Sequence, residues 1–368
     1  MKNHPAILPA TFFVLLNLFV QRSPAQSQII ASWDQSTIPY SELYAKVDSL
    51  RAALQVPALS MAIINHDKIV FSENFGYSDA ENQHPVDSLS IFEAASLSKP
   101  LFAFWVMQKA EQGLIDLDKP LVDYLEHPHI DSAYRDLYRP LTARMVLCHR
   151  SGFPNHAFGK PISLSFPPDS GFAYSGEAYQ YLARVLAHQM NLDFDANFNA
   201  RMRNELLKPM GLAHSSYTFS DYFYDHKVFG HGDTIEDRNP KLGVWGANEY
   251  LAYASLHSNA VEYAHFLLWM LKGKGLQPES HTEMLKEHTH FKDDNPLKKQ
   301  IGQTGWGLGF AQKQKENFTL HFHTGNNHVF QSYAMFIPSK NYGIVLFTNC
   351  GKMISIIEGL GSILGPQI

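Results

Sequence analysis

The sequence predicts a mixed α/β protein of the α+β kind, in which one antiparallel sheet is built from both ends of the chain. Three observations support this prediction. Apolar, β-rich runs occupy residues 58–75, similar runs return after residue 300, and the chain between them has mostly helical periodicity. We therefore place the sheet-forming parts at about 28–92 and 300–368, and an inserted all-helical lobe at about 93–299.

The composition is that of a globular protein. The chain has 368 residues, of which 45% are hydrophobic and 18% charged, enough to bury a substantial core. The formal net charge is -5 and no block of Lys or Arg occurs, which argues against a nucleic-acid partner. Cys148 and Cys350 are the only two cysteines, so we expect two separate buried thiols rather than a disulfide framework, although export would make a bond between them conceivable.

The N-terminus predicts export. Lys2 precedes an apolar run over residues 6–20, and a polar break then reaches the small residues of 23–25. We interpret residues 1–25 as a cleaved signal peptide and 26–368 as the mature domain, exported to the periplasm or secreted. The alternative is a membrane anchor, but the run is shorter than the roughly 20 apolar residues that a span needs. No stable membrane span is expected after cleavage.

The elements follow from periodicity and turn residues. The N-terminal part should begin with a helix over 41–54 and continue as a hairpin of strands 58–64 and 69–75. The middle should contain helices over 101–114, 142–148, 178–190, 196–210 and 260–271, with long loops over 155–173 and 215–249. The C-terminal part should contain strands 306–312, 318–322, 331–337 and 342–348, then a helix over 353–364.

The first chemical signal is a Ser-x-x-Lys spacing. Ser96 and Lys99 are three residues apart at the start of a predicted helix, so their side chains share one face. Pro100 fits the first turn, where its missing N–H costs no hydrogen bond. The apolar surroundings and the positive helix end disfavour a charged Lys99 and favour a neutral base beside the Ser96 hydroxyl. The alternative interpretation is a serine N-cap followed by an exposed lysine.

Four segments resemble one known family: the residues around Ser96 (92–100), a hairpin ending in Phe-Gly-Tyr (57–77), a Gly-Leu-Ile-Asp-Leu-Asp stretch (113–120) and a His-x-Ser-Gly segment (142–154). Together they resemble the class C β-lactamases and their relatives, the penicillin-binding-protein-like esterases and D-aminopeptidases. The resemblance implies the serine β-lactamase and DD-peptidase fold, with the active site where the sheet meets the helical lobe.

The family's second motif, Tyr-x-Asn, is incomplete here. Tyr174 stands at the position of the catalytic tyrosine, but Gly176 replaces the asparagine that contacts the substrate amide and the lysine in the family. The resemblance therefore implies that Tyr174 shares proton transfer with Lys99 and that β-lactam hydrolysis is impaired. An ammonium close to a phenol would lower the pKa of the phenol from about 10, as a base requires. The alternative for Tyr174 is a buried aromatic at a helix entrance.

The third motif is the tripeptide His323-Thr324-Gly325, which follows a predicted strand and resembles the family's Lys-Thr-Gly or His-x-Gly. Gly325 would let the substrate approach the backbone, and the N–H of Asn326 would form the oxyanion hole with the N–H of Ser96. A neutral His323 should hold a substrate carboxylate weakly. Val329 stands where the family commonly has a second glycine, which would narrow the entrance.

The histidines also allow a metal-site interpretation. His321 and His323 would share one face of a strand and His328 follows closely, but no carboxylate or cysteine partner stands nearby. We expect neither a metal nor another cofactor. His149 is interpreted as a structural residue that ties loops together rather than as a general base.

We therefore predict an exported serine hydrolase that forms an acyl-enzyme on Ser96, with Lys99 and Tyr174 in proton transfer and His323, Thr324, Gly325, Asn326 and Gly176 at the substrate. Its partner would be a small molecule or peptide with an ester, amide or β-lactam carbonyl. One alternative is a catalytically weak penicillin-binding-like protein that binds peptidoglycan-type peptides. The other is a metal-dependent hydrolase built on the histidines.

Overall fold

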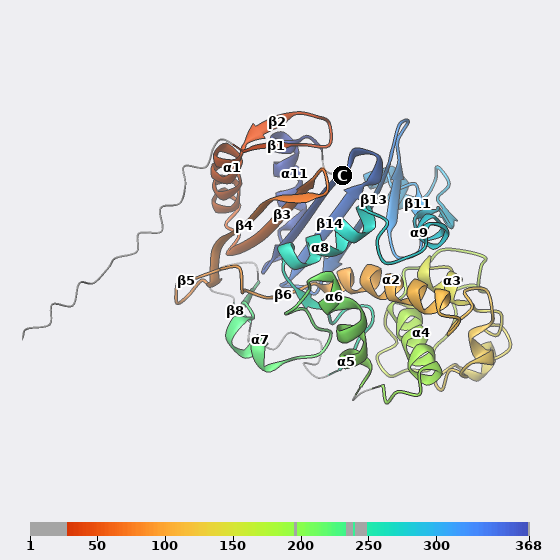
Figure 1. The fold of residues 1–368 in the computed structure, drawn as a ribbon. Helices are drawn as coiled ribbons and strands as arrows, with labels where there is room; N and C mark the ends of the chain where they lie inside the picture. Colours follow the sequence, from red (N-terminus) through yellow and green to blue (C-terminus); the bar gives the residue numbers. More distant parts are fainter. Residues whose placement is uncertain (1–27, 195–196, 233–237, 240–248, 367–368) are drawn as a thin grey trace, which may run out of the picture.

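The computed structural model describes residues 28–194, 197–232, 238–239 and 249–366 (Figure 1). The predicted signal peptide and part of the predicted loop 215–249 lie outside these residues. Within the described ranges, no helix combines the length and the apolar character that a membrane crossing requires.

The central feature is an antiparallel sheet of nine strands in the order β10-β11-β12-β13-β14-β15-β3-β4-β5. Its strands are β3 (Ala58–Asn65), β4 (Lys68–Asp79), β5 (His84–Pro85), β10 (Thr289–His290), β11 (Gly305–Trp306), β12 (Ala311–Gln314), β13 (Thr319–Asn326), β14 (Gln331–Ile337) and β15 (Tyr342–Thr348). Three short pairs complete the strands: β1 (Ile29–Ala31) with β2 (Thr37–Pro39), β6 (Phe92–Glu93) with β9 (His257–Ser258), and β7 (Gly230–His231) with β8 (Arg238–Asn239).

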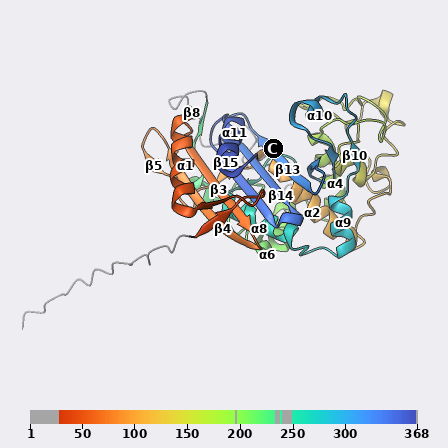
Figure 2. The same ribbon diagram turned by 90° about the horizontal axis from the view of Figure 1, so that it is seen from above.

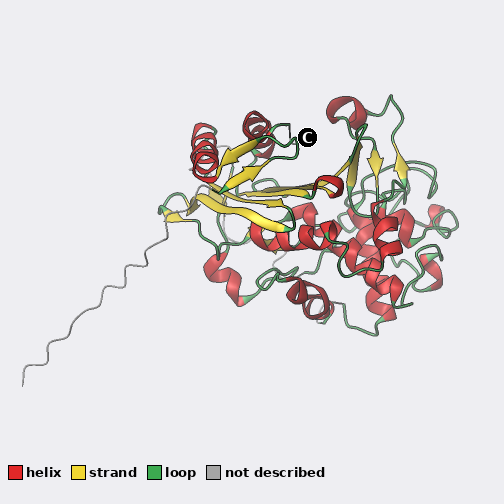
Figure 3. Cartoon of the chain, turned by 45° about the horizontal axis from the view of Figure 1, so that its top comes forward, coloured by secondary structure: helices red, strands yellow, loops and turns green. Residues whose placement is uncertain are grey.

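Both ends of the chain meet in this sheet, as the sequence predicts. Strands β3 and β15 pair antiparallel from Leu59 to Asn65 of β3 and along all of β15, with Ala62 opposite Val345, and every residue of both strands is buried. Such continuous burial requires a cover on each face of the sheet. Helices α1 (Tyr40–Ala53) and α11 (Met353–Leu364) pack together on one face, and α8 (Ala260–Leu271) packs on β3 and β15 from the other (Figure 3).

Most of the remaining helices form a second body beside the sheet (Figures 1 and 3). They are α2 (Ser98–Glu111), α3 (Ala143–Leu147), α4 (Gly176–Gln189), α5 (Phe198–Met202), α6 (Lys208–Met210), α7 (Asp221–His226) and α9 (Pro278–Leu285). The short helix α10 (Pro296–Ile301), in the connection from β10 to β11, lies apart from them beside the edge of the sheet (Figure 3). Nearly every residue of α2 is buried, including polar ones, so this helix lies in the interior rather than on the surface. The division of the chain at residues 93 and 299 stays a prediction.

Two element predictions are wrong in detail. The strand predicted over 306–312 is two antiparallel strands, β11 and β12, because Gly307 and Gly309 turn the chain between them and Gly309 has a φ of +97°. The helix predicted over 196–210 begins at Phe198 in the described residues and is interrupted by one π-helical segment, Arg203–Leu207, between α5 and α6.

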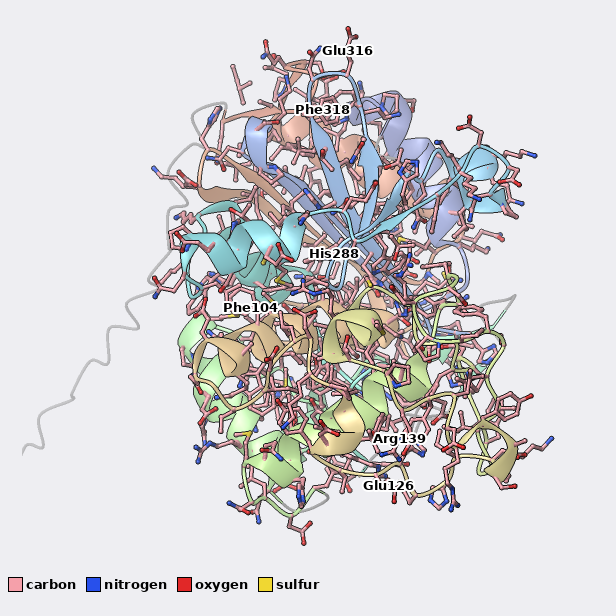
Figure 4. The ribbon with its side chains drawn as sticks, turned by 90° about the vertical axis from the view of Figure 1, so that its right-hand side faces the viewer. Phe104, Glu126, Arg139, His288, Glu316 and Phe318 are labelled. Carbon is pink, nitrogen blue, oxygen red and sulfur yellow. The ribbon has the colours of Figure 1, made fainter. Side chains whose placement is uncertain are left out.

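The junction between the two bodies is where the Ser-x-x-Lys segment lies. A short 3₁₀ turn, η1 (Ala95–Leu97), joins β6 to α2 and packs against β13 and β14. Figure 4 shows the sheet above the helices, with Glu316 and Phe318 at the far tip of the sheet, Glu126 and Arg139 at the opposite end, and His288 and Phe104 between them.

Candidate active site

Ser96 lies in the turn η1 rather than in the helix that the sequence predicts to contain it, because α2 begins only at Ser98. The turn starts with Ala95 at a φ of +49°, a left-handed conformation that costs free energy for a residue with a side chain. Buried tyrosines fix the segment after it: Tyr263 donates to the carbonyl of Leu97 at 3.0 Å and Tyr217 to the carbonyl of Ser98 at 2.6 Å. The surrounding helical body thus holds the strained turn in place.

Lys99 is buried beside Ser96. Its Nζ lies 3.1 Å from Ser96 Oγ and donates to the backbone carbonyl of Tyr253 at 2.9 Å, and the side chain is 1% exposed. Burial lowers the pKa of Lys99 well below its usual value of 10.5. A neutral amine has one lone pair, so an N–H directed at Tyr253 leaves the lone pair able to accept the Ser96 proton.

Tyr174 completes a compact group with these two residues. Its phenol is hydrogen-bonded to Ser96, and its ring centre lies 4.4 Å from Lys99 Nζ. Burial raises the pKa of Tyr174, so the expected lowering of this pKa by an ammonium is wrong. The physical reason is burial, which disfavours the charged form of the Tyr174 phenol and of the Lys99 amine alike. Tyr174 therefore stays protonated and is suited to donate a proton rather than to abstract one.

His149 packs behind this group. It is fully buried, its ring centre lies 4.4 Å from that of Tyr174, and its Nδ1 accepts from the backbone N–H of Ser175 at 3.1 Å. Burial, together with Lys99 and His323, lowers the pKa of His149 well below 6.5. A neutral ring that fixes the residue after Tyr174 agrees with the structural role that the sequence suggests for His149.

Strand β13 forms the opposite wall of the site. A Cβ at Gly325 would collide with Ser332 Oγ and with the carbonyl oxygen of Ala94, so only glycine allows β13 to lie this close to η1. Ser332 Oγ donates to the same carbonyl at 2.6 Å, which ties β14 to the strand before the turn. Asn326 ends β13 at this point and lines the cavity beside Ser96.

A cavity of about 390 Å³ opens between these walls. Ser96, Tyr174, His323, Thr324 and Asn326 all line it. The sequence-predicted residues that come from distant parts of the chain are thus brought together around one space. Much of the remaining lining is apolar and includes Phe172, Leu297, Ile301, Trp306 and Phe322.

The histidines of β13 do not form a metal centre. His323 Nδ1 lies 2.7 Å from the carbonyl oxygen of Thr324, and His321 stacks on Phe336 with 5.1 Å between ring centres. Burial lowers the pKa of each imidazole to about 3. Across the part of the chain that the structure describes, no group of three or more His, Cys, Asp or Glu residues is arranged to hold a metal ion.

The structure gives a steric reason for glycine at position 176, which the sequence does not reveal. A Cβ at this position would lie 2.7 Å from the ring of Tyr253 and 2.8 Å from the carbonyl oxygen of Asn155. The ring of Tyr253 therefore takes up space that a side chain at position 176 would need. The backbone of the same residue accepts from Lys99 Nζ, a contact that the family's asparagine would otherwise make.

Asn155 is a second residue that sequence motifs missed. Its Oδ1 accepts from the backbone N–H of Gly176 at 3.0 Å, which fixes the orientation of the side-chain amide. The Nδ2 group is then left as the free end of a side chain that lines the cavity. The only sequence signal was position: Asn155 opens the long predicted loop that follows the His-x-Ser-Gly segment.

Two further expectations concern single residues. Val329 is not among the residues that line the cavity; it packs against Gly230 of β7, where a Cβ would meet Val329 Cγ2 at 2.5 Å. The expected narrowing of the entrance by Val329 is therefore wrong. Cys148 and Cys350 are separate, buried, free thiols, and burial raises the pKa of Cys148 to about 11.

The fold is that of the penicillin-binding-protein and β-lactamase class. It superposes with a TM-score of 0.71 on a penicillin-binding protein homologue from Pyrococcus abyssi, at 19% identity over 88% of this chain and 77% of that one. With a D-alanine carboxypeptidase AmpC from Burkholderia cenocepacia the TM-score is 0.70, at 17% identity over 88% of this chain and 99% of that one. These likenesses establish the fold alone.

The family follows from the sequence comparison. A family model described as Beta-lactamase matches residues 43–355, so the chain belongs to the β-lactamase family, a family of serine hydrolases. Protein flp from Staphylococcus aureus is 21% identical over 318 residues, which cover 80% of this chain and 60% of that protein. The chain thus spans about 60% of the length of this curated relative.

Proposed function

We propose that the chain is an exported serine hydrolase that acts by a Ser96 acyl-enzyme, with esters preferred over β-lactams. The observation that carries this proposal is the buried amine of Lys99, whose pKa is lowered by burial and whose Nζ lies 3.1 Å from the Oγ of Ser96, a residue that lines the cavity. A hydroxyl beside a neutral base, with a hydrogen-bonded phenol next to both, is the arrangement that nucleophilic catalysis requires.

The proposed reaction proceeds in two halves. Ser96 Oγ bonds to the carbonyl carbon while its proton passes to Lys99 Nζ, and the N–H groups of Ser96 and Asn326 stabilise the tetrahedral oxyanion. The bond to the leaving oxygen then breaks. Tyr174 donates its proton to that oxygen and is reprotonated from Lys99, so the alcohol leaves with the Tyr174 proton and the proton taken from Ser96 replaces it on Tyr174. Water attacks the acyl-enzyme by the same route and releases the acid.

The preference for esters is argued from the substrate side of the cavity. β-Lactams and C-terminal peptides carry a carboxylate, yet no Lys or Arg is found among the described residues that line the cavity, and His323 is neutral above about pH 3. Gly176 supplies no side-chain amide either. Asn155 Nδ2 is the amide donor that we place at the substrate carbonyl in its stead.

Covalent labelling tests the nucleophile. A fluorophosphonate probe should label the purified protein, and the label should survive denaturation of the protein. The Ser96→Ala and Lys99→Met variants should not be labelled. Lys109→Met is a matched control, because Lys109 is also a buried lysine of α2 but pairs with Glu205 away from the cavity. Labelling that persists in Ser96→Ala would refute the proposed mechanism.

A substrate comparison tests the specificity. We expect p-nitrophenyl acetate or butyrate to be hydrolysed with a higher kcat/KM than a cephalosporin reporter. The reverse order would show that the missing asparagine and the missing cation matter less than we argue. The alternative of a catalytically weak binding protein, which the glycine at 176 favours, would appear as stoichiometric labelling without turnover of either substrate.

A further inference from the structure

The active-site cavity borders a second cavity through one residue, Ile301. This residue ends α10 and lines both the cavity at Ser96 and an outer cavity of about 490 Å³ between α10 and α11. The outer cavity is lined by Gln300, Ile301, Ile354, Ile357, Glu358 and Gly361, with Pro366 at its edge. Figure 2 shows the two helices that form it on either side of β13 in the view from above.

Two large aliphatic side chains that line the outer cavity are exposed to solvent. Ile354 is 73% exposed and Ile301 is 40% exposed, although both are large aliphatic side chains. Single exposed isoleucines are common on protein surfaces, but these two flank the same hollow, next to the buried Ile357. An apolar ligand that covers them would remove this surface from water.

The active-site side of Ile301 is apolar too. Leu297, four residues earlier on α10, and Phe322 of β13 line the first cavity beside it. An apolar surface therefore leads from the cavity of the nucleophile, past Ile301, to Ile354 on α11. No Lys or Arg of the described residues lines either cavity, and the one charged side chain of the outer cavity is the acidic Glu358.

We propose that this surface binds the acyl chain of the substrate, so that the enzyme prefers uncharged esters of medium-chain fatty acids. This inference rests on the proposed function, because it takes the acyl carbon to be bonded to Ser96. The chain would run from Ser96 along Leu297 and Ile301 and end at Ile354. The exposed Glu358 would disfavour a chain that ends in a carboxylate, since two negative charges would face each other at the end of the cavity.

A chain-length series tests the inference on the full-length protein. We expect kcat/KM for p-nitrophenyl octanoate to exceed that for the acetate by about tenfold or more, because each methylene that leaves water contributes to binding. The octanedioic acid mono-p-nitrophenyl ester has the same length but ends in a carboxylate. The kcat/KM for this ester should be no higher than that for the acetate.

Single substitutions test whether the preference for longer acyl chains depends on the outer cavity. Ile354→Ser should lower the ratio of kcat/KM for octanoate over acetate by roughly fivefold to tenfold, as expected for a lost aliphatic contact. Leu89→Ser is the matched control. Leu89 is 43% exposed, lies outside both cavities, and forms its hydrogen bonds through the backbone: its N–H donates to Asp87 and its carbonyl accepts from Tyr222. It should leave the ratio unchanged.

The outcomes separate the two proposals. Ser96-dependent hydrolysis of the acetate with no gain at longer chains, or with a ratio that Ile354→Ser leaves unaltered, would overturn the acyl-chain inference and leave the proposed function intact. Absence of Ser96-dependent turnover for every ester, together with absence of labelling at Ser96, would overturn both.

Discussion

Three basic side chains lie buried around the nucleophile, and none of them is favoured in its charged form. Burial is the largest cause of the lowered pKa of Lys99, His149 and His323. Lys99 also lowers the pKa of both histidines, because a second positive charge in the same site would be repelled. Positive charge on any one of them would make charge on the others less favourable. The neutral amine is the form of Lys99 that can accept the Ser96 proton.

The close packing of Gly176 against Tyr253 leads to a prediction at one position. Gly176→Asn, which restores the family's motif, should destabilise the protein by roughly 1–3 kcal/mol, because a Cβ would stand 2.7 Å from the Tyr253 ring and an overpacked core must shift. Urea unfolding followed by fluorescence would measure this. The kcat/KM for an ester should fall as well, since Tyr253 also holds Lys99.

The paired change distinguishes steric conflict from a general defect. In a Tyr253→Ala background, Gly176→Asn should cost clearly less stability than it does in the unchanged protein, because the ring that occupied the space is gone and the Asn155 carbonyl is the close contact that remains. Residues in contact show such coupling, whereas distant ones add. Additive losses in the double variant would mean that Tyr253 does not exclude a side chain at position 176.

At the level of residues, the motifs predicted the nucleophile and the two proton-transfer residues. They did not predict which residues take the place of the asparagine that is missing at position 176. Ser96, Lys99 and Tyr174 were located by spacing and resemblance, and the structure gathers them within hydrogen-bonding or ring contact. Tyr253 was not found because it acts through a backbone carbonyl, which any residue type supplies. Asn155 was not found because its orientation depends on a hydrogen bond to Gly176, 21 residues away.

At the scale of elements, the site depends on how closely β13 approaches η1. The Gly325 position admits no side chain, and Ser332 of β14 bonds across to Ala94. Gly325→Ala should therefore push β13 away from the nucleophile turn and destabilise the protein by about 2 kcal/mol or more. The kcat/KM for esters should drop by more than the stability loss alone explains, because the N–H of Asn326 moves with the strand. Thermal unfolding and ester kinetics at a temperature well below the midpoint would measure both.

A second strand glycine serves as the control for Gly325. A Cβ at Gly343 in β15 would have as its nearest neighbour the end of the Ile64 side chain, at 3.3 Å, and a flexible chain end can move. Gly343→Ala should cost little and leave ester kinetics unchanged. Equal effects of the two substitutions would contradict the claim that β13 is held specifically against the site.

The strands show why some elements were predictable and others were not. Strands β14 and β15 have the bounds that their apolar runs and the Pro-Ser-Lys-Asn turn predict, since both are buried along most of their lengths. β10 and β11 have two residues each, too few to show a period. β11 pairs with β12 through the turn at Gly307 and Gly309, and β10 pairs with β11 across the connection that contains α10, so both pairings are tertiary features.

For the whole molecule, the sequence predicts that the two chain ends share a sheet, and the pairing of β3 with β15 confirms it. The position of α8 was not predicted: it lies in the middle of the chain yet packs on the sheet, because its Phe266 and Leu267 need an apolar surface to cover. Periodicity identifies an amphipathic helix but not the surface it packs on. The chain-length specificity likewise depends on α10 and α11 meeting across a cavity.

The whole molecule also contains many buried histidines, and these predict its response to acid. Burial lowers the pKa of His127 and His257 to about 4 and that of His321 and His323 to about 3. In the unfolded chain each would bind a proton near its ordinary pKa of about 6.5. Between pH 6.5 and about 4 the unfolded state therefore binds more protons, so the free energy of unfolding falls as the pH falls.

Urea unfolding at pH 7.5, 6.5 and 5.5 would measure this dependence. At pH 5.5 each of the four histidines should have lowered the free energy of unfolding by about 1.4 kcal/mol, so together by about 5 kcal/mol. Carboxylates with a lowered pKa, such as Asp118 and Glu205, have ordinary values of 3.8 and 4.5 and contribute mainly at lower pH. His321→Gln should make the slope shallower by about one proton. A flat profile down to pH 5.5 would show that these rings take up protons without unfolding.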